Sequence, residues 1–204
     1  MLPPTTIAVL AIHRHYACSL AIVDKRTKVL AAAVEVLGAG GSRALTHRAV
    51  DAAAGMPAGS TSNYFRTRNA LVTGVLEYLS EIGIAAIQEL AGMPRPVDVA
   101  EFARLMAGMY THLLEHGRLA QVARRVVFTE AAWNAELQAA IGEAGVPFQR
   151  LMADWLRSLG AADPEPDARL LMIFLDGLLA DRLIHPDSGV DVESAITRFL
   201  RGLL

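Results

Sequence analysis

The chain has 204 residues, enough for one or two domains with a sizeable core, because 53% of them are hydrophobic. Its single cysteine, Cys18, excludes an internal disulfide, so a reducing cytoplasm is the simplest compartment. Net charge is −2, but residues 1–68 carry eight Lys/Arg and three Asp/Glu, a net +5, against −7 for the remainder. This asymmetry favours a polyanionic partner for the amino-terminal part; the alternative is chance segregation of charge on solvated faces.

Residues 1–22 form an N-terminal extension whose sequence differs in character from the rest of the chain. Pro3-Pro4 block an early helix, and no helical period appears. We expect either that the natural chain starts near Val23, since valine codons can act as start codons, or that residues 1–22 form a real N-terminal arm. The apolar run 7–12 is far shorter than the roughly 20 residues of a spanning helix, and basic residues come after it, whereas a signal peptide has them first. We therefore expect no membrane partner.

The rest of the sequence predicts an all-α fold. Alanine and leucine dominate, aromatics are few, and apolar residues recur at helical spacing. The expected helices span 24–37, 46–54, 57–64, 68–91, 97–116, 119–128, 136–159, 166–184 and 192–203.

Capping residues and glycines set the expected boundaries of the first four helices. Asp24 lies near the start of the first helix, and the glycines of 38–41 end it, as glycines do at helix C-termini. Thr46 and Thr67 are expected N-caps of the second and fourth helices. Pro57 suits the first turn of the third helix, where its missing N–H costs nothing.

The stretch GMPAGSTSNYF, residues 55–65, has the composition of a loop although it lies between two good helices. Three short helices with a tight glycine turn between the second and third fit a helix-turn-helix, whose second helix of the pair enters the DNA major groove. Small residues let the helix backbone approach DNA closely, and hydroxyl and amide groups bind phosphates and bases. Phe65 would anchor the helix end in the core.

The spacing of these residues resembles the signature of TetR-type transcriptional regulators, a glycine turn and then roughly G-V-x-x-G-T-L-Y-x-Y-F-x-x-K-x-x-L. Residues 55–71 are GMPAGSTSNYFRTRNAL, and residues 45–55, LTHRAVDAAAG, look like the family's preceding helix. The resemblance implies a three-helix DNA-binding domain over 23–70, joined by a long fourth helix to a larger helical regulatory domain over 71–204. It also implies a double-stranded DNA operator, a small-molecule effector and a homodimer.

Carried over residue by residue, the resemblance implies a DNA-binding set. Thr46 would bind phosphate, and Arg48 would reach a base or a phosphate. Ser62 stands where the family often has a tyrosine that touches phosphate, and Arg68 replaces a lysine, which changes a compact ammonium to a planar fork. The full set is Thr46, His47, Arg48, Ala58, Gly59, Ser60, Ser62, Asn63, Tyr64 and Arg68.

The carboxyl-terminal helices carry broad apolar faces that suit a dimer interface. Two such helices from each of two chains would form a four-helix interface, although part of each face must bury against its own domain. The candidate interface residues are Leu171, Phe174, Leu178, Ile196, Phe199, Leu200 and Leu203.

Methionine and aromatic residues in the same region suggest an effector pocket, although such residues are more often plain core. His112, Arg125 and Glu130 would supply polar groups, and an apolar or amphipathic small molecule is the expected ligand. The candidate pocket residues are Met106, Met109, Tyr110, His112, Leu113, Arg125, Phe128, Trp133, Phe148, Met152, Trp155 and Met172.

The leading hypothesis is a ligand-responsive repressor that binds a palindromic operator as a homodimer and is released by its effector. The alternative is a helical small-molecule carrier or an enzyme without DNA binding. We expect no enzyme and no cofactor, because the sequence has no G-x-S-x-G, P-loop or paired carboxylates. His112 and His116 share a helix face, as metal ligands can, but no third ligand stands at readable spacing, so we expect no metal.

Overall fold

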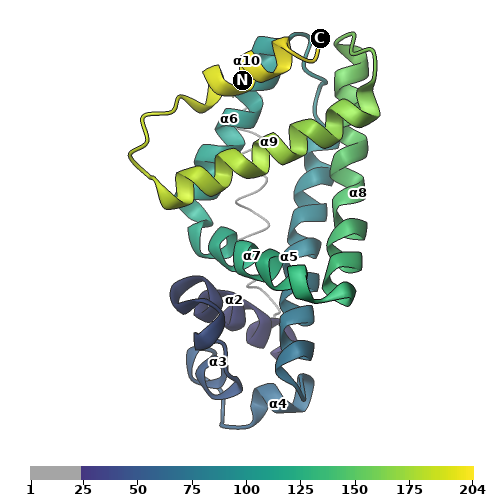
Figure 1. Cartoon of the computed structure of the whole chain (residues 1–204). Helices are drawn as coiled ribbons and strands as arrows, with labels where there is room; N and C mark the ends of the chain where they lie inside the picture. The colour runs from purple at the N-terminus through teal and green to yellow at the C-terminus, as the bar shows by residue number, and fades with distance from the viewer. Residues whose placement is uncertain (1–23) are drawn as a thin grey trace. The chain divides into compact units, whose positions relative to one another are not determined.

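The structure, a computed structural model, describes residues 24–204, and these form helices joined by turns (Figure 1). The predicted extension over 1–22, with the expected start near Val23, lies outside the described residues. The all-α prediction is confirmed for the rest. The helices are α2 (Lys25–Ala44), α3 (His47–Ala53), α4 (Ser60–Tyr64), α5 (Arg68–Ala91), α6 (Val99–His116), α7 (Arg118–Glu130), the 3-10 turn η1 (Ala131–Trp133), α8 (Ala135–Ser158), α9 (Pro164–Ile184) and α10 (Val192–Arg201).

Side-chain caps start three of these helices where the sequence predicts them. Asp24, Thr46 and Thr67 each accept a hydrogen bond from the backbone N–H three residues further on, at 2.8, 3.1 and 3.1 Å. Each cap satisfies one of the N–H groups that a helix start leaves without an intrahelical partner. The predicted N-caps Thr46 and Thr67 are confirmed, and Asp24, expected near the start of the first helix, is its N-cap.

Contacts divide the described chain into two compact units. The amino-terminal unit contains residues 24–83 and 117–144, and the carboxyl-terminal unit contains residues 84–116 and 145–204. This division differs from a single boundary at residue 70, because α7 packs along α2 and thereby belongs with the first helices.

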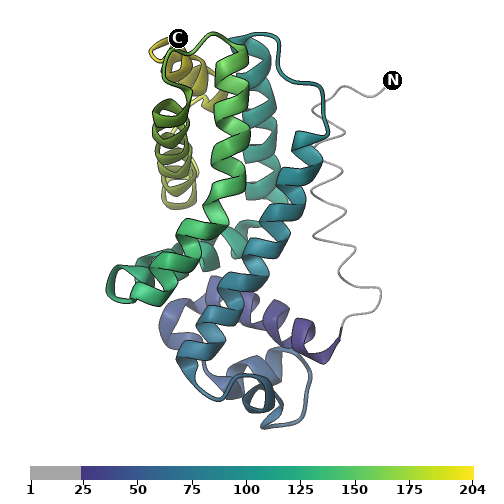
Figure 2. The same cartoon turned by 90° about the vertical axis from the view of Figure 1, so that its right-hand side faces the viewer.

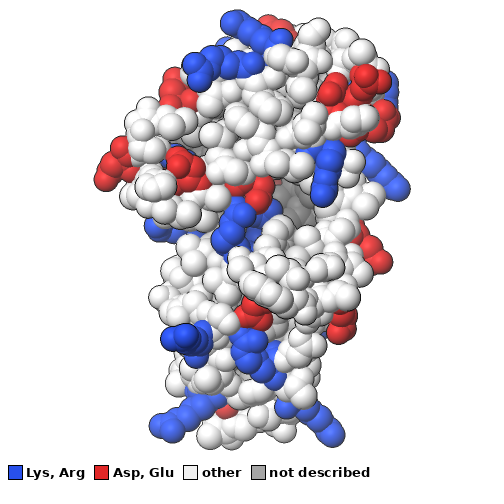
Figure 3. Space-filling view, viewed as in Figure 1, with Lys and Arg blue, Asp and Glu red and all other residues white. Residues whose placement is uncertain are grey.

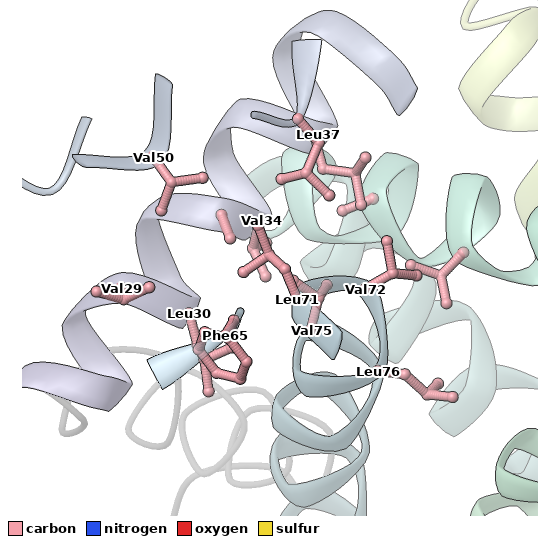
Figure 4. Close-up of a cluster of buried hydrophobic side chains, with 14 of the residues drawn as sticks. Val29, Leu30, Val34, Leu37, Val50, Phe65, Leu71, Val72, Val75 and Leu76 are labelled. Carbon is pink, nitrogen blue, oxygen red and sulfur yellow. The ribbon is translucent and has the colours of Figure 1, made fainter. Parts of the chain in front are cut away.

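The core of the amino-terminal unit joins α2, α3 and α5 (Figure 4). Leu37 of α2, Val50 of α3 and Leu71 of α5 are completely buried, and Phe65 fills the space beside Leu30. Burial of each such side chain stabilises the fold by about 1.5–3 kcal/mol. The predicted anchoring role of Phe65 in the core is therefore confirmed.

The glycines of 38–41 end the first regular helix, a few residues later than the predicted end at residue 37. Gly41, with φ 69° and ψ −170°, is non-helical, so a kink separates the helix that begins at Lys25 from a short last turn that reaches Ala44. At Gly38 a Cβ atom would lie 2.3 Å from the carbonyl oxygen of Leu119, so the missing side chain lets the backbone of α7 approach α2. The prediction that these glycines end the helix is therefore confirmed at Gly41, while Gly38 also serves helix packing.

The core of the carboxyl-terminal unit is built from α6, the second half of α8, α9 and α10. Figure 2 shows α9 running alongside that half of α8. Phe102 and Trp155 meet edge to face with ring centres 5.6 Å apart, and Phe174 of α9 stacks on Phe199 of α10 at 4.1 Å. Aromatic pairs of this kind contribute about 0.5–1.5 kcal/mol beyond their burial.

α5 is the one helix within residues 24–204 that is long and apolar enough to cross a membrane. Length and composition are weak evidence, because the core helix of a soluble protein passes the same test. The first half of α5 supplies Leu71, Val72, Val75 and Leu76 to the core of the amino-terminal unit.

Candidate nucleic-acid interface

The turn between α3 and α4 depends on two glycines in left-handed conformations. Gly55 has φ 59° and Gly59 has φ 91°, a region in which residues with a Cβ atom are strained. Gly59 is the N-cap of α4, so the helix begins at Ser60 and Pro57 lies in the turn. The prediction of a helix that starts at Pro57 was wrong, while the predicted succession of helix, glycine turn and second short helix is confirmed.

A buried carboxylate on α3 holds the first turn of α4. Asp51 is 4% exposed, and its two oxygens accept hydrogen bonds from Gly59 N at 2.8 Å, Thr61 N at 2.7 Å and Thr61 Oγ1 at 2.6 Å. Thr61 is itself completely buried. The bonds satisfy N–H groups that a helix start leaves open, and they tie α4 to α3.

The other end of α4 is tied to α3 as well. The side chain of His47, in the first turn of α3, places Nε2 2.6 Å from the carbonyl oxygen of Phe65. Because a carbonyl only accepts, Nε2 donates this hydrogen bond. From the sequence, His47 was only a possible DNA contact, and the structure gives it this partner within the helix pair.

The hydrogen bonds also set the ionisation of Asp51. Burial alone would raise the pKa of its carboxyl, but the bonds from Thr61 and Gly59, together with the nearby His47, outweigh burial and lower the pKa below the ordinary value of 3.8. The carboxylate is therefore ionised at neutral pH, and the unit keeps a negative charge behind α4.

This pKa predicts how acid weakens the amino-terminal unit. A pKa that is lower in the folded state adds stability above the unfolded value of 3.8, and the addition is lost as pH falls through the folded value. We expect the difference in urea midpoint between the wild type and Asp51→Asn to keep its full size from pH 7 down to about pH 4, and to become smaller at lower pH. A difference that stays constant down to pH 3 would contradict the assignment.

The outer face of α4 carries the polar side chains that the sequence assigned to DNA. Ser62 and Asn63 are exposed, and Tyr64 is 42% exposed. Ser60 is half-buried, and its hydroxyl donates to the carbonyl of Pro57 at 2.6 Å, so it also closes the turn. The predicted residues Thr46, Arg48, Ala58 and Gly59 are exposed as well, on α3 and the turn.

The stretch of chain that contains α3 and α4 presents no exposed carboxylate. Asp51 is the only acidic residue between positions 36 and 76, and it is buried. The same stretch contains the exposed residues Arg43, Arg48 and Arg66. Figure 3 shows Lys and Arg side chains projecting from the amino-terminal unit, in the lower part of the view. Such a surface attracts a polyanion through long-range electrostatics.

Arg68, which the signature assigns to phosphate binding, is engaged inside the unit. Its guanidinium holds both carboxylate oxygens of Glu130, at 3.0 and 2.7 Å, and also the hydroxyl of Ser42 at 2.7 Å. The hydrogen bonds from Arg68 and Ser42 lower the pKa of Glu130 against the effect of burial. The cluster ties the end of α7 to α2 and α5.

The candidate effector residues divide between the two units. Met106, Tyr110, His112, Met152 and Trp155 are buried in the carboxyl-terminal unit. Met109 and Phe148 pack against this core, Leu113 and Met172 are half-buried in the same unit, and Arg125, Phe128 and Trp133 belong to the amino-terminal unit. Trp133 is 83% exposed.

The candidate interface residues also divide by burial. Leu171, Ile196 and Leu200 are completely buried within their own unit, so they are not surface groups. The others, Phe174, Leu178, Phe199 and Leu203, are half-buried. The neighbouring Leu170 and Ile173 of α9, absent from the predicted set, are 51% and 57% exposed.

Comparison with known protein families shows which family the chain belongs to. The model of the tetracyclin repressor-like C-terminal domain matches residues 97–204, more than half of the chain. The chain belongs to the TetR family of transcriptional regulators. No curated protein matches it.

Solved structures of TetR-like regulators have the same fold. A transcriptional regulator from Rhodococcus sp. Rha1 is 21% identical with a TM-score of 0.74, and covers 88% of this chain and 95% of its own. The multidrug binding protein EbrR complexed with ethidium is 25% identical with a TM-score of 0.67, covering 89% and 99%. The fatty acid degradation regulator FadR from Bacillus halodurans is 16% identical with a TM-score of 0.69, covering 89% and 95%.

Sequence reasoning missed the polar contacts that hold the TetR-type helix pair together. Thr61 stands at the leucine of the family signature, and this departure was the available signal for a buried polar partner on α3. Asp51 in an otherwise apolar helix stretch, AVDAAA, was the second signal. Glu130 was considered only as a pocket group, because its distance of 62 residues from Arg68 hides their pairing.

Because Arg68 binds Glu130 and Ser42, we expect its substitution to affect the stability of the protein more than its binding to DNA phosphates. Because the Arg68 side chain is 46% exposed, we expect Arg68→Gln to lower the free energy of unfolding by only about 1 kcal/mol. We also expect the slope of log affinity for DNA against log salt to stay unchanged. A fall of about one in that slope would instead identify Arg68 as a phosphate contact.

Proposed function

We propose that this TetR-family protein is a DNA-binding regulator that reads its operator through α4. The proposal depends on one observation. α4 exposes a polar face with Ser62 and Asn63, and the stretch of chain that contains it, residues 36–76, has no exposed carboxylate. Both features suit a helix that lies in the major groove, between two phosphate backbones.

The exposed groups suit different parts of the duplex. The Asn63 amide matches the donor and acceptor pair of adenine in the major groove, and Ser62 suits either base edges or phosphates. Arg43, Arg48 and Arg66 suit phosphates, because guanidinium groups bind them bidentately. The hydroxyls of Thr46 and Tyr64 are further phosphate donors. Ala58 and Gly59 leave room for the DNA backbone beside the turn.

A homodimer would place two copies of α4 in successive grooves of a near-palindrome. Its interface would use the half-buried Phe174, Leu178, Phe199 and Leu203, extended by the exposed Leu170 and Ile173 of α9. The fully buried Leu171, Ile196 and Leu200 would support these side chains from beneath.

The effector would bind within the carboxyl-terminal unit and favour a state with lower DNA affinity, as expected for a repressor. Met106, Met109, Phe148 and Met152 suit an apolar or amphipathic ligand, because methionine and aromatic side chains adapt to irregular apolar surfaces. A relative, EbrR, forms complexes with ethidium and proflavin, which supports such a ligand. We exclude Trp133 from the proposed effector site because it is 83% exposed.

Selection of DNA from a random duplex pool tests the proposal. The purified protein is incubated with the pool, bound duplexes are recovered and sequenced over several rounds, and sedimentation measures the stoichiometry on the enriched duplex. We expect a near-palindromic motif, occupied by two chains. A pool that remains random after several rounds at low salt would contradict operator binding, and an enriched motif occupied by one chain would contradict only the dimer.

A further inference from the structure

α4 is too short to hold its own conformation. It has five residues, and isolated helices shorter than about 12–15 residues are marginal in water. Its position on the amino-terminal unit is therefore set by contacts at its ends. At the carboxyl end these are the burial of Phe65 and the bond from His47 to the Phe65 carbonyl.

At the amino end of α4, Asp51 receives three hydrogen bonds from two residues. The donors are Gly59 N, Thr61 N and Thr61 Oγ1, at 2.6–2.8 Å. Two of them are backbone groups on either side of Ser60, so the carboxylate fixes both the rotation of α4 about its axis and its distance from α3. Bonds to a charged acceptor of this length are among the stronger ones in proteins.

We infer that Asp51 is a positioning residue for operator discrimination: it acts through α4, without touching DNA, and holds Ser62 and Asn63 in the orientation that base recognition needs. The inference rests on the proposed function. Hydrogen bonds to base edges demand fixed geometry, whereas attraction to phosphates comes from charges that tolerate small displacements.

The charge arrangement separates these two effects. Asp51 is buried, and the exposed residues Arg43, Arg48 and Arg66 stay in place when it changes. Loss of Asp51 should therefore reduce the preference for operator over unrelated DNA. It should leave weak binding to unrelated DNA, and the dependence of that binding on salt, nearly unchanged.

The test compares dissociation constants for the selected operator and for an unrelated duplex, at a temperature where unfolding curves show every variant folded. Asp51→Asn keeps the shape but presents an amide N–H₂ to backbone donors. Thr61→Val is nearly isosteric and removes one donor only, so it remains informative if Asp51→Asn fails to fold. Asp24→Asn is the matched control, because Asp24 also caps a helix of this unit through one backbone N–H.

We expect Asp51→Asn to weaken operator binding at least tenfold and Thr61→Val about threefold, with unrelated duplex within twofold of wild type in both. Asp24→Asn should leave the ratio of the two constants unchanged. An unchanged ratio in folded Asp51→Asn, or in Thr61→Val if the former does not fold, would overturn the inference alone. A wild type without operator preference would overturn the proposed function and the inference with it.

Discussion

Gly38→Ala is expected to destabilise the protein, although alanine is the better helix former. The new Cβ would lie 2.3 Å from the Leu119 carbonyl oxygen and 2.8 Å from its carbon, so α2 and α7 must separate. Overpacking against backbone costs about 3 kcal/mol, at the upper end of its usual range, and helix propensity returns about 1 kcal/mol. We expect a net loss of about 2 kcal/mol, which lowers the melting temperature by roughly 4–8 °C.

The same substitution elsewhere in the unit gives the opposite sign. Gly142 lies within α8 and is exposed, and a Cβ there would meet nothing within 4 Å. Gly142→Ala should therefore raise the free energy of unfolding by about 0.5–1 kcal/mol through helix propensity alone. Thermal unfolding followed by circular dichroism checks both variants. Equal shifts in the two would show that α7 does not approach α2 as the structure has it.

Ser62→Glu is expected to abolish operator binding while leaving the fold intact. The residue is exposed on α4, so a carboxylate costs little in the free protein. In the complex it would face DNA phosphates, and like charges placed together cost several kcal/mol. We expect affinity for the selected operator to fall by a factor of about 100 or more.

Ala139→Glu is the control for charge alone. This exposed residue of α8 adds the same charge to the same unit, away from the helix pair in the sequence. Its operator affinity should stay within about threefold of wild type, since screening weakens distant charges. Fluorescence anisotropy on the same duplex compares the variants. A similar loss in both would mean that total charge, and not the face of α4, governs binding.

Much of this fold could be predicted because its signals are local. Helical spacing predicted the order of the helices, and the caps Thr46 and Thr67 predicted the starts of two of them, since a cap acts within three residues of its own position. The helix-turn-helix was predictable for the same reason: the glycine turn and the polar helix after it are adjacent in sequence.

The features that could not be predicted depend on partners far along the chain. Gly38 lies in the glycine run that ends the first helix, but the need for glycine at this position comes from Leu119, which α7 brings against it. Arg68 stands at the position of a phosphate contact in the signature, but its guanidinium is hydrogen-bonded to Glu130 within the unit. Pro57 suits a helix start, but the Asp51 bonds to Gly59 and Thr61 place that start at Ser60.

The candidate site was predicted in part for a similar reason. The exposed positions of α4 follow from the signature, and the structure leaves Ser62, Asn63 and Tyr64 on the surface. Apolar spacing alone does not say which side of a helix meets its own core. Leu171 and Ile196 were therefore grouped with Phe174 as interface residues, although both are completely buried within one chain.

The central claim, sequence-preferring binding of duplex DNA by the helix pair, is tested most directly by anisotropy titrations of the selected operator and an unrelated duplex across a salt series. We predict operator binding at least 10³-fold tighter than binding to the unrelated duplex near physiological salt, and affinities that fall steeply as salt rises, because phosphate contacts release counterions. Equal affinities for the two duplexes, or no binding to either at low salt, would contradict the account.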